Sequence, residues 1–224
     1  MTVHLTKEIE TLKKNILALS AAVEESVHKA VKAIDEKDGD LAREVIDNDG
    51  LIDQTEVDIE EECLKLLALH QPVAIDLRFI VAVLKINSDL ERIGDLAVNL
   101  AERALYLYMH PPVDLPFDFR AMAKKAQSML KSSLDALVNM DEKLAARVIA
   151  EDDAVDAMNL EMYIKVQGAI KKDIDGLDRY IHFLSASRHL ERIADHATNI
   201  AEDVIYMING EIVRHKAEDF EKLG

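Results

Sequence analysis

The stretch SDLERIGDLAVNLAERA at 88–104 returns as RHLERIADHATNIAEDV at 188–204, an offset of 100 positions. Chance does not place so many identities in so short a window, so the match predicts duplicated structure. On a helical wheel the apolar members of the first copy share one face, and the polar members lie beside it. The identities are Leu90/Leu190, Glu91/Glu191, Arg92/Arg192, Ile93/Ile193, Asp95/Asp195, Ala97/Ala197, Asn99/Asn199, Ala101/Ala201 and Glu102/Glu202.

A second match extends the repeat toward the N-terminus. DLAREVIDNDGLID at 40–53 aligns with KLAARVIAEDDAVD at 143–156, now at an offset of 103. Helical periodicity predicts six long helices, over about 6–35, 41–69, 73–108, 120–139, 141–171 and 177–208. The sequence therefore predicts an all-α protein, a tandem duplication of an antiparallel three-helix bundle.

Proline marks the boundary between the two halves. Three of the four prolines, Pro111, Pro112 and Pro116, fall in MHPPVDLPFDF, where the helical pattern stops and then restarts. We predict a first bundle over 1–110, a linker over 111–116 and a second bundle over 117–224.

Composition narrows the class of function. The formal net charge is −16, which disfavours nucleic acid and anionic lipid as partners and favours cations or basic surfaces. The single cysteine, Cys63, fits a reducing cytosol rather than a disulfide framework. No apolar leader or run of 18 apolar residues is present, so we expect a cytoplasmic protein that does not insert into a membrane.

The doubled motif carries the strongest functional signal. Glu91, Asp95 and Asn99 recur at four-residue steps, which stacks their oxygens on one helix stripe, and Glu191, Asp195 and Asn199 repeat the arrangement. The preceding helix of each half offers a second carboxylate pair, Asp49/Asp53 and Asp152/Asp156. If the stripes of neighbouring helices face each other, each half gains an oxygen-rich site suited to Mg²⁺, Mn²⁺, Ca²⁺ or iron.

A structural explanation of these residues competes with the metal sites. Carboxylate pairs at this spacing are common on solvated helix faces, and Arg92 and Arg192 could neutralise them without a metal. Glu25 and His28 form one Glu-x-x-His pair, whereas a di-iron bundle needs two. We expect His189 and His196 to be partly exposed surface residues rather than ligands. We expect Arg78 and Arg179 to form salt bridges within each bundle, with anion contacts as the alternative. No credible catalytic apparatus is present, so we do not expect an enzyme.

These features together resemble the PhoU family of phosphate-signalling regulators. The resemblance rests on the duplicated bundle, the paired acidic motifs, QPVAIDLR before the third helix, and LERIGD followed by LERIAD. It covers the whole chain. Two departures stand out, Ala194 in place of Gly94 and the absence of Gln-Pro before the sixth helix, and neither removes an oxygen ligand.

The resemblance implies a cytoplasmic homodimer that links the phosphate transporter ATPase to a PhoR-type sensor histidine kinase as a negative regulator. It also implies divalent or trivalent metal ions, iron first and Mn, Mg or Zn as alternatives, which some relatives lack. A metal-storage or redox bundle and a metal-free helical scaffold remain alternative functions. The metal ligands that it implies are Asp49, Asp53, Glu91, Asp95 and Asn99 in the first half, and Asp152, Asp156, Glu191, Asp195 and Asn199 in the second.

Overall fold

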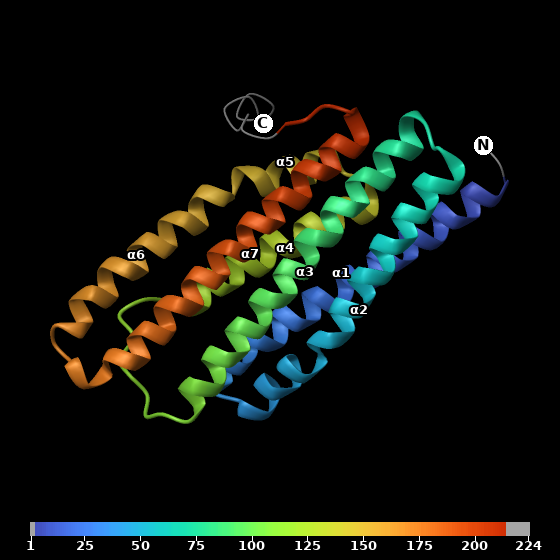
Figure 1. Cartoon of the computed structure of the whole chain (residues 1–224). Coiled ribbons are helices and arrows are strands. Elements are labelled where there is room, and N and C mark those ends of the chain that lie inside the picture. The colour runs from blue at the N-terminus through green and yellow to red at the C-terminus, as the bar shows by residue number, and fades with distance from the viewer. Residues whose placement is uncertain (1–2, 214–224) are drawn as a thin grey trace.

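The computed structural model describes residues 3–213 and is built from helices arranged in two similar halves (Figure 1). The first half contains α1 (Val3–Glu36), α2 (Gly39–His70) and α3 (Ala74–Tyr108). The second contains α4 (Phe119–Asn139), α5 (Glu142–Ala150), α6 (Asp152–Ile170), the short 3₁₀ helix η1 (Ile174–Gly176) and α7 (Leu177–Asn209). The predicted all-α repeat is confirmed. The predicted bundle limits reach residues 1 and 224, which lie outside the described residues.

The turn after the first helix of each half is also duplicated. Lys37 and Met140, at equivalent positions, both adopt a left-handed backbone conformation with φ of 54° and 50°. The next residue in each half is an aspartate that caps the following helix. Asp38 accepts hydrogen bonds from the backbone N–H groups of Asp40 and Leu41, and Asp141 accepts one from that of Leu144. A carboxylate at this position satisfies N–H groups that the helix itself leaves unpaired, so the cap fixes where each second helix begins.

The centre of the molecule is the antiparallel pair α3 and α7 (Figure 1). α1 and α2 pack against α3, and α4, α5 and α6 pack against α7. The buried faces of α3 and α7 match at the repeat offset of 100, with Leu90 and Leu190, and Ile93 and Ile193, all without exposed area. Each central helix therefore serves both the core of its own half and the seam between the halves.

One predicted helix is wrong in detail. The fifth, expected as a single helix over 141–171, is interrupted at Glu151, where the N–H of Glu151 bonds Val148 O and the N–H of Ala154 bonds Glu151 O. These three-residue steps replace the four-residue steps of an α-helix. The apolar pattern does not reveal the break, because Val148 and Val155 are buried on either side of it.

Arg78 and Arg179, at corresponding positions near the starts of α3 and α7, each lie near the C-terminal end of the other central helix, and Arg179 also bonds within its own half. Arg179 donates to Pro111 O, beyond the end of α3, and to Asp175 O. Arg78 lies against Gly210, the C-cap of α7, whose φ is +77°. Among residues 3–213 neither guanidinium forms the expected salt bridge, and Arg179 instead bonds backbone carbonyls of both halves.

The burial of Cys63 allows the packing of α2 to be tested by thiol labelling. Its side chain has no exposed area, and burial, then Glu62 and Glu60, raise the pKa of its thiol to about 12. Because the thiolate is the reactive form, we expect negligible reaction with Ellman's reagent at pH 8 in the folded protein and one thiol per chain in denaturant. Rapid stoichiometric labelling of the folded protein would show that α2 does not pack as described.

Candidate metal centres

The first half brings its predicted ligands from α2 and α3 into electrostatic contact. Burial raises the pKa of Asp49, and the charges of Asp53 and Asp95 raise it further. Burial also raises the pKa of Glu91, followed by Asp95, Glu56 and Asp53. Groups that perturb one another in this way share a local environment, so the carboxylates of the two helices face a common region.

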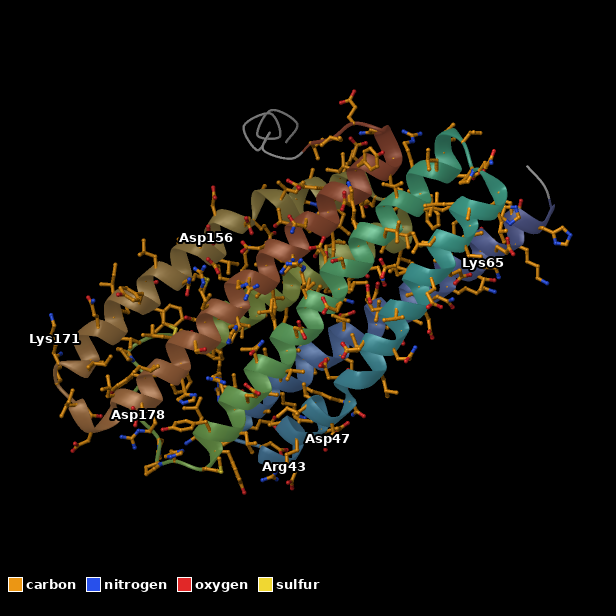
Figure 2. All side chains as sticks on the ribbon, in the orientation of Figure 1. Arg43, Asp47, Lys65, Asp156, Lys171 and Asp178 are labelled. Atoms are coloured by element: carbon orange, nitrogen blue, oxygen red, sulfur yellow. The ribbon has the colours of Figure 1, made fainter. Side chains whose placement is uncertain are left out.

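The second half repeats this arrangement between α6 and α7. Burial, then Asp195, raise the pKa of Asp152 to about 6, against a smaller opposing hydrogen bond from Thr198. The pKa of Glu191 is raised by burial and then by Asp195, and that of Asp195 by burial and then by Asp156. Figure 2 shows Asp156 on α6.

Equivalent ligands have equivalent exposure in the two halves. The inner carboxylates, Asp49 and Glu91 in one half and Asp152 and Glu191 in the other, are partly buried. The outer carboxylates are exposed, namely Asp53, Asp95, Asp156 and Asp195.

Ala194 stands where the first half has Gly94, and a smaller side chain on the neighbouring helix makes room for its methyl group. A Cβ at Gly94 would lie 3.1 Å from Cγ2 of Ile52 and 3.7 Å from Oδ1 of Asp49. In the second half Ala194 supplies that methyl group, and Val155 stands where the first half has Ile52. The pair keeps its total volume, which cores tolerate well. The substitution thus leaves Asp152 room beside the central helix, as Asp49 has.

The asparagines take different partners in the two halves. Asn99 donates from Nδ2 to Asp95 O on its own helix, whereas Asn199 donates to Oδ1 of Asp89 across the seam, at 3.3 Å. Because both donors come from the amide nitrogen, the amide oxygen of each residue remains the atom suited to a cation.

Carboxylate oxygens are suitable ligands for a hard cation. In this structure, however, these side chains do not converge on a single point. Oδ1 of Asp49 and Oε2 of Glu191 are buried with no hydrogen-bond donor. Such unpaired oxygens are costly unless a cation or proton meets them. Within residues 3–213, no three His, Cys, Asp or Glu side chains are close enough to hold a metal ion.

Glu56 and its hydrogen-bond partner lie near the first site but were not predicted to do so. Glu56 perturbs Glu91 and accepts from Nδ2 of Asn87 at 3.0 Å. Its repeat counterpart is Asn159, which accepts from Ser187 at 3.0 Å, so the same pair of positions carries a different polar contact. Glu56 stands three residues after Asp53, a helical spacing that marks it as a neighbour of the stripe.

The prediction for the two histidines is wrong for His196. This side chain is buried, with 9% exposure, and its Nδ1 lies 2.8 Å from Oδ1 of Asp89 on α3. His189 is partly exposed as expected, yet burial, followed by Arg103 and Arg192, lowers its pKa to about 4. Both lie at the α3–α7 seam. Sequence periodicity could not place them there, because the seam forms between helices a hundred residues apart.

Two clefts open along this seam. One, of about 350 Å³, is lined by Glu91, Asp95 and Asn99 with residues of both central helices. The other, of about 660 Å³, is lined by Asp152, Asp195 and Asn199, again with residues of both helices. Ser88 and Arg92 line both clefts. The two candidate sites therefore open to neighbouring solvent-filled spaces rather than to opposite faces.

Comparison with known proteins identifies relatives over nearly the full chain. The sequence model of the PhoU domain matches residues 16–104 and 119–204, once in each half. The phosphate-specific transport system accessory protein PhoU homolog of Aquifex aeolicus is 40% identical over 212 residues, 95% of this chain and 96% of that protein. The PhoU accessory protein of Serratia marcescens is 33% identical, over 96% of this chain and 89% of that protein.

Solved structures agree with the sequence relatives. The crystal structure of PhoU from Pseudomonas aeruginosa is similar with a TM-score of 0.88 and 37% identity, covering 92% of this chain and 99% of that one. The phosphate transport system regulatory protein PhoU from Streptococcus pneumoniae gives 0.84 and 31%, covering 93% and 99%. The fold is thus shared with these proteins over more than nine-tenths of this chain.

Proposed function

This chain belongs to the PhoU family, and from that premise we propose that it is an accessory regulator of phosphate-specific transport. The relatives that it matches are named as accessory proteins of that system. Within the described range, no helix is both long and apolar enough to span a bilayer. We further propose a cytoplasmic homodimer that binds the transporter ATPase and a PhoR-type sensor kinase, and that has no enzymatic activity.

The proposed regulator carries two metal sites, one in each half. The observation that supports them is the recurrence, at equivalent positions, of inner carboxylates that burial and like charge both make hard to ionise. A bound cation would be held by Asp49, Asp53, Glu91, Asp95 and Asn99 in the first half, and by Asp152, Asp156, Glu191, Asp195 and Asn199 in the second. Oxygen ligands of this kind suit Mn²⁺, Mg²⁺ or iron better than a soft metal.

Storage or redox chemistry is the alternative function that the acidic sites suggest. It requires oxygen-dependent iron turnover or many irons per chain, whereas a regulator requires neither. Elemental analysis of protein purified without chelator or an affinity nickel column counts the ions directly. A content far above the few ions that two sites can hold would favour storage.

The regulatory role is tested by deleting the gene in its own host. Without a negative regulator the sensor kinase should stay active, so phosphate-starvation genes should be expressed in high phosphate. Transcript levels in high and low phosphate measure the effect. Complementation with the wild-type gene is the control, and starvation genes that remain repressed in high phosphate after deletion would contradict the role.

A further inference from the structure

The duplicated arginines Arg92 and Arg192 do not neutralise the acidic stripes in the way that their spacing allows. Within residues 3–213, neither guanidinium takes part in an ion pair or a hydrogen bond. Both arginines are exposed. Their donor N–H groups are thus available to something other than the neighbouring carboxylates.

The two arginines come from different halves but line one cleft. The cleft of about 350 Å³ is bordered by both, together with Ser88, Asn99 and the carboxylates Glu91 and Asp95. The antiparallel packing of α3 on α7 brings them there, because the doubled motif lies near the middle of each helix. Arg92 and its repeat copy Arg192 therefore line the same cleft.

Paired guanidinium groups are suited to a tetrahedral oxyanion. Each offers a planar fork of donors that matches phosphate oxygens, and Ser88 adds a hydroxyl donor. The carboxylates of Glu91 and Asp95 oppose the entry of an anion while they are uncompensated. A cation held by the same carboxylates removes that opposition and adds a positive charge at the wall of the cleft.

We propose that Arg92 and Arg192 form a binding site for free inorganic phosphate in this cleft, which fills only when metal occupies the adjacent carboxylates. This inference rests on the proposed metal sites. The linkage is reciprocal, so phosphate should tighten metal binding by the same factor by which metal tightens phosphate binding. The protein would then respond to phosphate and metal together.

Equilibrium dialysis of radiolabelled phosphate against Mn²⁺-loaded and chelator-treated protein tests the site. We expect phosphate binding to the loaded protein alone, and a loss of about tenfold or more in affinity in the Arg92→Gln/Arg192→Gln variant, as removal of charge-assisted bonds predicts. Manganese content, measured on the same samples, should equal that of the wild type. Arg92→Lys/Arg192→Lys keeps the charge without the fork, so its affinity should be intermediate.

The matched control is Arg43→Gln/Arg147→Gln. It removes one exposed arginine from each half and the same total charge, away from the cleft. Wild-type affinity in the Arg92/Arg192 variant, or equal phosphate binding after chelation, would overturn the proposal. If Mn²⁺-loaded protein binds no phosphate, this inference is wrong, but the proposed metal sites are unaffected. Protein that takes up no manganese fails at the earlier step and overturns both.

Discussion

Metal is expected to raise the melting temperature of the chelator-treated protein by about 5 to 10 °C for each occupied site. A ligand at a hundredfold excess over its dissociation constant stabilises the native state by about 2.7 kcal/mol, and a chain of this size gains about 2–4 °C per kcal/mol. The gain should grow with free metal concentration. Calorimetry with Mn²⁺, Fe²⁺, Mg²⁺ and Zn²⁺ measures it and ranks the metals.

The Asp95→Asn/Asp195→Asn variant should lose most of this gain while its helices remain intact. Both residues are exposed, so the change removes a ligand charge without opening a core cavity. The charge-matched control is Asp58→Asn/Asp135→Asn, which removes one carboxylate from each half, on α2 and α4 rather than on the central helices. If no metal stabilises the wild type more than the Asp95/Asp195 variant, the acidic stripes are solvated helix faces without bound metal. Their presence in both halves would then reflect duplication of the sequence and not a metal-binding role.

Asp152→Asn is expected to stabilise the metal-free protein at pH 7 by about 3 to 6 °C, although it removes a proposed ligand. The folded-state pKa of Asp152, about 6, lies above the ordinary 3.8. The native state therefore holds the proton more tightly than the unfolded chain. Stability from this group is fully present below pH 3.8 and is lost as pH rises through 6. After allowance for partial solvent exposure, the loss is about 1 to 2 kcal/mol at neutral pH.

The pH dependence of the wild type contains an opposing contribution from His189. Its pKa of about 4 lies below the ordinary 6.5, so its contribution is present above pH 6.5 and is lost as pH falls through 4. Melting curves of wild type and Asp152→Asn between pH 4 and 8 isolate the carboxylate by difference. The difference should vanish near pH 4, and a constant difference across the range would contradict the assignment. With saturating Mn²⁺ the sign should reverse at pH 7, because the metal needs the ionised ligand.

The repeat, the helical class and the acidic stripes can all be read from the order of the amino acids. These properties depend on neighbours within a few turns of one chain segment, where covalent geometry fixes which side chains share a face. Glu91, Asp95 and Asn99 must lie on one stripe of any helix that contains them. The family resemblance follows from the same residues, and the comparisons confirm it.

Contacts between helices set how the surroundings of the two copies differ and where the copies lie against each other. The break at Glu151, the close approach of Gly94 to Ile52, and the burial of His196 against Asp89 depend on packing between helices. Apolar periodicity shows that a face is buried but not which helix covers it. The convergence of Arg92 and Arg192 on one cleft follows from the antiparallel packing of α3 on α7. Since that contact joins residues a hundred positions apart, no local pattern could specify it.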